Sequence, residues 1–183
     1  MNFFFLAGCA LMGLAALGTT QAQAQAGDMA DPLEGITNYV KISDRLSTSG
    51  QVAYDQIEAL KEAGFEVVVN LAPASDDANG LEGFLVVEQG MSYVQIPVSW
   101  REPSQRDLRL FFDVMEANRD RKVYVHCFAN MRASAFVYLY RTLREGVPAD
   151  QARVDMEKIW KPEDLEQWNA FIQTARAEHD AGS

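Results

Sequence analysis

Hydrophobic positions along the chain follow two spacings that alternate from residue 36 onward. Short, nearly continuous β-branched or aromatic runs predict strands at 36–42, 65–71, 93–98 and 122–126. Apolar residues at every third or fourth position predict helices at 52–63, 81–89, 132–144, 149–158 and 162–177, and another that begins after Ser104. Strands that alternate with helices predict an α/β domain with a mostly parallel central sheet flanked by helices.

Two polar segments separate these elements. Residues 43–50, which include Ser47, Thr48 and Ser49, predict a solvated turn, and residues 72–80 predict a loop because they are rich in Pro, Asp, Asn and Gly. The larger aromatic residues Phe111, Phe112, Trp160 and Trp168 are expected in the core. For Trp100, core packing and ligand binding remain equally open.

The beginning of the chain has a different character, because no charged side chain occurs before Asp28. An apolar run over 3–17 followed by small residues predicts a signal peptide at 1–26, although the usual positive residues ahead of the run are missing. The run is shorter than the roughly 20 residues that cross a bilayer, so no stable membrane insertion is expected after processing. We therefore expect a periplasmic protein.

An alternative for this region is lipidation. The stretch Leu6–Ala7–Gly8–Cys9 resembles a lipobox, which would place a lipid on Cys9. With the signal peptide removed, residues 27–35 predict a flexible tether and 36–183 a single folded domain.

Charge and cysteine content limit which partners, cofactors and kinds of chemistry are expected. The formal net charge is −10 and no basic stripe offsets it, so a nucleic-acid partner is not expected. His, Cys and carboxylate residues show no metal-ligand spacing, so neither a metal nor another cofactor is expected. Loss of the leader would leave Cys127 as the one cysteine, which is then either buried and inert or kept for its reactivity.

The segment YVHCFANMRAS, residues 124–134, places Cys127 in a short turn between a predicted strand and a predicted helix. Backbone N–H groups at such a turn bind oxyanions and stabilise a thiolate, which is the nucleophilic form of cysteine. Arg132 adds a planar cation that pairs well with phosphate. Asn130 tolerates a left-handed backbone and could hold the turn through its side chain.

This segment resembles the signature loop of the cysteine-dependent protein tyrosine and dual-specificity phosphatase superfamily, in particular its bacterial dual-specificity-phosphatase-like group. The similarity extends over 41–51, 68–71 and 96–98. It implies a dual-specificity-phosphatase-like fold and a hydrolase that acts on phosphomonoesters through a cysteinyl-phosphate intermediate. The implied substrate is a phosphorylated small molecule or a phosphoprotein.

The resemblance also implies roles for individual residues. Cys127 matches the nucleophile, Arg132 the phosphate-binding arginine and His126 the residue that supports the thiolate from behind. The family's general acid is an aspartate shortly after the Ile–Pro strand. Here Glu102 is the nearest carboxylate and the predicted acid, with Asp107, Asp76 and Asp77 as alternatives. The predicted substrate-binding residues are His126, Phe128, Ala129, Asn130, Met131, Arg132 and Ser134.

Two departures from the superfamily pattern keep other functions open. The pattern has five residues between cysteine and arginine and then a hydroxyl residue, whereas four residues separate Cys127 from Arg132 and Ala133 follows. The shorter spacing resembles the loop of rhodanese-like sulfurtransferases, which would use a Cys127 persulfide. A catalytically inactive anion-binding module is the third possibility.

Overall fold

The computed structural model describes Met1 and residues 31–182 of the chain. The predicted signal peptide beyond Met1 and residues 27–30 of the predicted tether lie outside the described residues. Five strands form one sheet in the order β1–β2–β5–β3–β4. The strands are β1 (Val40–Lys41), β2 (Leu46–Ser49), β3 (Val67–Asn70), β4 (Ser92–Gln95) and β5 (Val123–His126). Among the strands that the structure describes, β1 and β2 pair antiparallel and the other pairs are parallel, which confirms the mostly parallel sheet.

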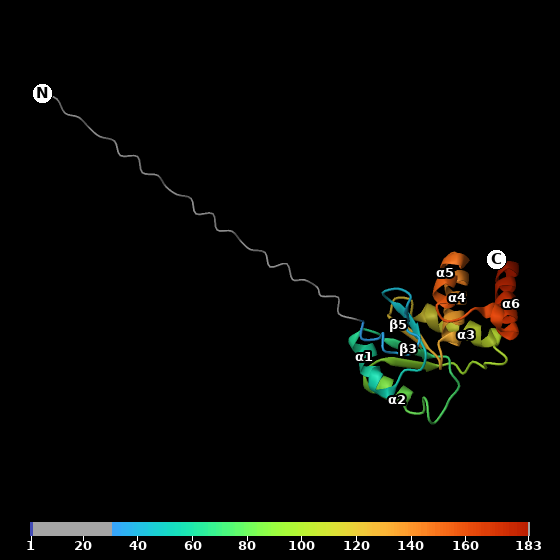
Figure 1. The fold of residues 1–183 in the computed structure, drawn as a ribbon, viewed down its shortest axis with the longest axis horizontal. Helices are drawn as coiled ribbons and strands as arrows, with labels where there is room; N and C mark the ends of the chain where they lie inside the picture. The colour runs from blue at the N-terminus through green and yellow to red at the C-terminus, as the bar shows by residue number, and fades with distance from the viewer. Residues whose placement is uncertain (2–30, 183) are drawn as a thin grey trace.

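Helices cover both faces of this sheet, as predicted (Figure 1). One face carries α1 (Ile57–Glu62) and α2 (Glu82–Glu88), and the other carries α3 (Gln105–Ala117) and α4 (Met131–Leu143). The last two helices, α5 (Ala149–Glu157) and α6 (Glu166–Gly182), pack against α4. Within residues 31–182, no helix combines the length and apolar character that a bilayer crossing requires.

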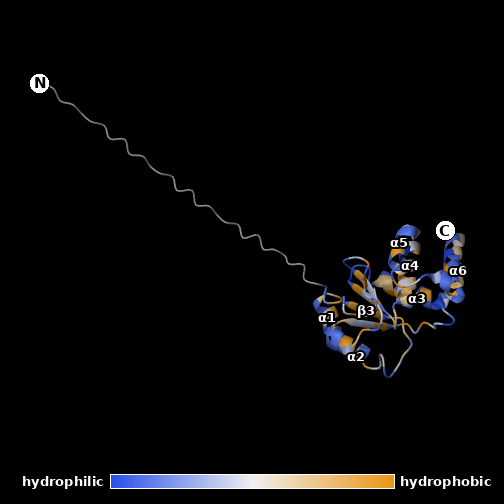
Figure 2. Cartoon of the chain, viewed as in Figure 1, coloured by the Kyte–Doolittle hydropathy of each residue, from blue (hydrophilic) through white to orange (hydrophobic). Residues whose placement is uncertain are grey.

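The core has two layers because side chains alternate along each strand. In β3, Val67 and Val69 face the layer that includes α3 and α4, whereas Val68 faces the layer that includes α1 and α2. Figure 2 shows the resulting contrast between hydrophobic positions near the sheet and hydrophilic outer turns on α1 and α5. The predicted core residues Phe111, Phe112, Trp160 and Trp168 are all buried, which confirms their assignment.

The beginning of the domain differs from the prediction. The strand expected over 36–42 is limited to Val40–Lys41, and Ile36 is buried in a turn. Leu33 is also buried and belongs to the smaller core layer, so packed residues extend into the range predicted as a tether.

The prediction of a solvated turn at 43–50 was wrong for Leu46–Ser49, which form the fully buried strand β2. The hydroxyl residues of β2, Ser47, Thr48 and Ser49, tolerate burial because they form hydrogen bonds. Ser49 Oγ donates to Gly50 O over 2.7 Å, and Thr48 Oγ1 accepts a hydrogen bond from Asn130. Strand β2 therefore inserts polar groups between β1 and β5, next to the loop that follows β5.

Helix α2 lies unusually close to β4 because its second residue is glycine. A Cβ at Gly83 would lie 2.9 Å from the ring of Tyr93, so a larger residue would force the helix and the strand apart. Glu82, the first residue of α2, contacts Asn70 and His126, the last residues of β3 and β5.

Candidate active site

Polar residues end three neighbouring parallel strands at the same edge of the sheet. Asn70 ends β3, Gln95 ends β4 and His126 ends β5, and the strand register pairs Asn70 with both of the others. In open α/β sheets, this carboxyl edge is where ligands bind. Strand β5 continues directly into residues 127–130, here called the Cys127 loop, and then into α4.

The carbonyl groups of the Cys127 loop are taken up by neighbouring backbone and side-chain donors. Gln51 N donates to Phe128 O over 3.1 Å, and Asn38 Nδ2 donates to Ala129 O over 3.1 Å. A side chain at Gly50 would meet Phe128 O at 3.0 Å, so the approach of the two segments depends on this glycine. Hydrogen bonds to the carbonyl oxygens of Phe128 and Ala129 therefore hold the Cys127 loop in place.

Asn130 closes the loop in the left-handed conformation that asparagine tolerates. Its φ angle is 64° and its side chain is fully buried. Nδ2 donates to Asn38 O over 2.7 Å and to Thr48 Oγ1 over 3.0 Å, which confirms that the side chain holds the turn. The asparagine therefore fixes the position at which α4 begins.

Several backbone donors at this turn are left without a partner. Ser134 N donates to Asn130 O as the first hydrogen bond of α4. The preceding N–H groups of Phe128, Ala129, Met131 and Arg132 donate to no acceptor within residues 31–182. Unpaired N–H groups at a helix N-terminus form a ready anion-binding site, and the helix dipole adds to the attraction.

Arg132 supplies a cation beside these donors. Its side chain is 8% exposed, and its guanidinium carbon lies 5.3 Å from the ring centroid of Trp100 and 5.9 Å from that of Phe128. No carboxylate pairs with Arg132 among the described residues, and its Nε is buried without an acceptor. The two rings thus hold a guanidinium that remains available for an external anion.

Cys127 lies at the base of this arrangement as a free cysteine with no exposed surface. An external group can therefore reach the sulfur only if neighbouring side chains move. Of the two rings beside Arg132, Phe128 is 37% exposed, whereas Trp100 is partly buried and packs against Trp160 and Trp168.

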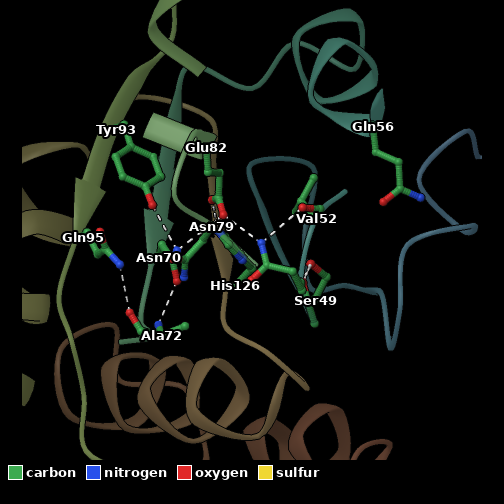
Figure 3. Close-up of polar contacts among 12 residues, drawn as sticks. Ser49, Val52, Gln56, Asn70, Ala72, Asn79, Glu82, Tyr93, Gln95 and His126 are labelled. Atoms are coloured by element: carbon green, nitrogen blue, oxygen red, sulfur yellow. Dashed lines mark hydrogen bonds and ion pairs between the residues drawn. The ribbon is translucent and has the colours of Figure 1, made fainter. Parts of the chain in front are cut away.

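A buried polar network surrounds His126, the residue that precedes Cys127 (Figure 3). His126 and Glu82 are 0% and 1% exposed, and His126 Nε2 lies 2.5 Å from Glu82 Oε1, close enough for an ion pair but outside hydrogen-bond alignment. Gln51 Nε2 donates to Glu82 Oε2 over 2.7 Å. A buried carboxylate is costly unless such partners satisfy it, so the network fixes the residue that precedes Cys127.

The network continues across the sheet edge through Asn70. Its Nδ2 lies 3.5 Å from Glu82 Oε2 and donates to Tyr93 OH over 3.0 Å, while Ala72 N donates to its Oδ1 over 2.7 Å. Burial, followed by the nearby Glu82 carboxylate, raises the pKa of Tyr93 well above its usual value, so this hydroxyl keeps its proton. Strands β3, β4 and β5 are thereby connected to α2.

Sequence reasoning missed Glu82, Gln51 and Tyr93 as parts of the site. A charged residue on a short helix is usually exposed, so Glu82 gave no signal by itself. The available signal was the row of polar residues at the carboxyl ends of buried strands, of which Asn70 is the clearest.

Two further predicted site residues, Ser134 and Glu102, lie outside the Cys127 loop. The Ser134 hydroxyl is engaged by protein groups, since Oγ donates to Met131 O over 3.2 Å and accepts from Trp160 Nε1 over 3.1 Å. Glu102 is exposed and makes no hydrogen bond or ion pair with the Cys127 loop among the described residues. Trp100, two residues earlier, is the point at which this segment contacts Arg132, so the acid role of Glu102 stays a prediction.

The remaining predicted alternatives for the acid also lie in solvent-facing segments. Asp76 and Asp77 are exposed on the loop after β3, and Asp107 lies in the first turn of α3. Among the described residues, no group of three or more His, Cys, Asp and Glu side chains is placed to hold a metal ion.

The chain is similar in sequence and structure to proteins described as phosphatases. Residues 34–174 match the family described as DSP-PTPase phosphatase fused to NAD+ kinase. A DUF442 phosphatase-group protein from Shewanella putrefaciens CN-32 is 38% identical, with a TM-score of 0.71 over 81% of this chain and 97% of that one. TpbA from P. aeruginosa shares the fold at 16% identity, with a TM-score of 0.63 over 79% of this chain and 90% of that one.

A curated relative is longer. The beta-lactamase hydrolase-like protein of Agrobacterium fabrum (strain C58) is 30% identical over 126 residues, which cover 67% of this chain. The match spans 28% of that relative, so this chain corresponds to just over a quarter of its length.

The buried network predicts that Glu82 is needed for stability. Replacing Glu82 by Ala leaves His126 and the Gln51 amide without their partner, and we expect the free energy of unfolding to fall by about 3–5 kcal/mol. Glu88→Ala is the matched control, because Glu88 is exposed on the same helix. It should change stability by no more than about 0.5 kcal/mol. Urea denaturation measures both, and equal losses in the two variants would contradict the network's role.

Proposed function

Since the chain belongs to the DSP-PTPase family of cysteine-dependent phosphatases, we propose that it hydrolyses phosphomonoesters through a cysteinyl-phosphate intermediate at Cys127. One observation supports this proposal above all others. Cys127 lies in the loop that leads into α4, whose first N–H groups are unpaired within the described residues, and Arg132 in the first turn of that helix has no carboxylate partner there. That combination suits a tetrahedral dianion.

The proposed reaction has two displacements. The Cys127 thiolate attacks phosphorus, so an S–P bond forms while the P–O bond to the leaving group breaks, and Glu102 protonates the departing oxygen. Water then attacks the same phosphorus, the S–P bond breaks, and Glu102 takes the proton from the water. The loop N–H groups and Arg132 hold the non-bridging oxygens during both steps.

The proposed substrates are phosphoproteins or phosphorylated small molecules. TpbA, which shares the fold, has been solved in complex with pTyr. In this chain, the rings of Trp100 and Phe128 flank Arg132, and such aromatic walls favour a phosphate carried on an aryl group. Residues 1–26 are proposed to be a signal peptide that directs the protein to the periplasm, on the basis of their uncharged, apolar sequence.

A second candidate function rests on the loop length. Only four residues separate Cys127 from Arg132, which favours a rhodanese-like sulfurtransferase that carries a persulfide on Cys127. The two functions differ in which donor, phosphate ester or thiosulfate, transfers a group to the sulfur.

Replacing Cys127 by Ser separates these possibilities. We expect the variant to lose aryl phosphate hydrolysis by on the order of 10⁴-fold or more, because the hydroxyl is a far weaker nucleophile in this setting. Phosphate binding should persist, since the loop N–H groups and Arg132 are unchanged. Steady-state assays with phenyl phosphate and with thiosulfate are the measurement. Full phosphatase activity in the variant would exclude the covalent mechanism, whereas thiosulfate turnover by the parent protein without phosphate release would favour the sulfurtransferase.

Replacing Glu102 by Gln tests the proposed acid. Hydrolysis of phenyl phosphate should slow by about 10²- to 10⁴-fold, with a smaller loss for p-nitrophenyl phosphate, whose leaving group needs no proton. Glu88→Gln, on an exposed position of α2, is the control and should leave both rates unchanged. If Asp107→Asn shows the leaving-group dependence and Glu102→Gln does not, the acid is Asp107.

A further inference from the structure

A cavity lies at the opposite end of β5 and α4 from the Cys127 loop. Its volume is about 300 Å³, and its lining includes Leu46 and Val123, the first residues of β2 and β5, together with Tyr140 near the end of α4. The four residues of β5 span about 13 Å, so the cavity is separate from the candidate active site. This volume is at the small end of the range for ligand pockets.

Several arginines line this cavity, although the protein as a whole is acidic. Four of the chain's 16 Lys and Arg side chains line it, namely Arg45, Arg119, Arg121 and Arg141, although the net charge is −10. One carboxylate, that of Glu145, lies among the lining residues. The lining therefore carries an excess of positive charge over an apolar floor that includes Met115 and Val147.

Two of these arginines have structural partners. Arg141 forms an ion pair with Asp155 at 2.8 Å. Arg121 Nη1 donates to Asn118 Oδ1 over 3.0 Å, and its Nε lies 3.5 Å from Glu66 Oε2. The contacts of Arg141 and Arg121 with protein groups give both side chains a structural role that needs no ligand.

The other two arginines are not explained in this way. Arg119 has one exposed carboxylate at 3.8 Å, on its neighbour Asp120, which is a weak interaction. The Arg45 guanidinium makes no ion pair or hydrogen bond within residues 31–182. Burial raises the pKa of Glu145, whereas Arg141 and Arg45 act in the opposite direction, so Arg45 lies near this carboxylate without pairing with it.

We propose that this cavity binds a small organic anion, with the apolar part of the ligand on the floor and its sulfonate, phosphate or carboxylate group toward Arg45 and Arg119. Guanidinium groups recognise such oxyanions through paired hydrogen bonds, and the apolar floor removes the rest of the ligand from water. This site is independent of the phosphatase reaction, because it shares no residue with the Cys127 loop.

The test uses 1-naphthalenesulfonate, which a phosphatase cannot hydrolyse, and its uncharged analogue 1-naphthalenemethanol. Each is titrated into the full-length protein while methyl and amide NMR signals are followed. The sulfonate should shift the methyl signals of Val123, Leu46 and Val147, and it should bind more tightly than the alcohol. The double variant Arg45→Gln/Arg119→Gln should weaken sulfonate binding by about 5- to 10-fold and leave the alcohol unaffected.

Arg106→Gln is the matched control, because Arg106 is exposed outside the cavity and its loss lowers the positive charge equally per substitution. It should change sulfonate affinity by less than about twofold. Shifts confined to the Cys127 loop would overturn the proposal, as would equal affinities of the parent protein for the two compounds or an unchanged affinity in the double variant. Thermal melting that matches the parent shows that the double variant is folded. Phosphatase activity is not part of this readout, so failure here leaves the proposed function unaffected.

Discussion

The site depends on one constraint, which is that the backbone N–H groups of Phe128, Ala129, Met131 and Arg132 have no acceptor among the described residues. Chain segments from elsewhere in the fold maintain this state. Gln51 and Asn38 bind the loop carbonyls, and the left-handed Asn130 starts α4 abruptly, so the turn cannot satisfy its own donors. An external anion is the partner that this geometry requires.

The buried network gives this turn a rigid base. Glu82, His126, Gln51 and Asn70 come from different segments and meet around His126, the residue that precedes Cys127. The close approach of α2 at Gly83 places Glu82 there. The rings of Trp100 and Phe128 flank Arg132, which lies in the first turn of α4.

Local patterns were sufficient to predict the parts of this architecture that are local in sequence. The alternation of strands and helices predicted the sheet and its covering helices, and residues 124–134 predicted the turn. Strand β2 was missed because its hydroxyl residues look solvated until their partners are known. Glu82 was missed because its burial depends on residues 31 and 44 positions away in the chain, Gln51 and His126, which no local pattern reveals.

Amide NMR of the full-length protein during a titration with inorganic phosphate shows directly whether the Cys127 loop is an anion-binding site. Phosphate should cause saturable shifts of the Phe128, Ala129, Met131 and Arg132 amides. Arg132→Lys should weaken phosphate binding, whereas Arg144→Lys, at an arginine that likewise stacks on an aromatic ring, should not. Loop amides that stay unchanged at saturating phosphate, or equal affinities in the two variants, would contradict an anion-binding role for the loop.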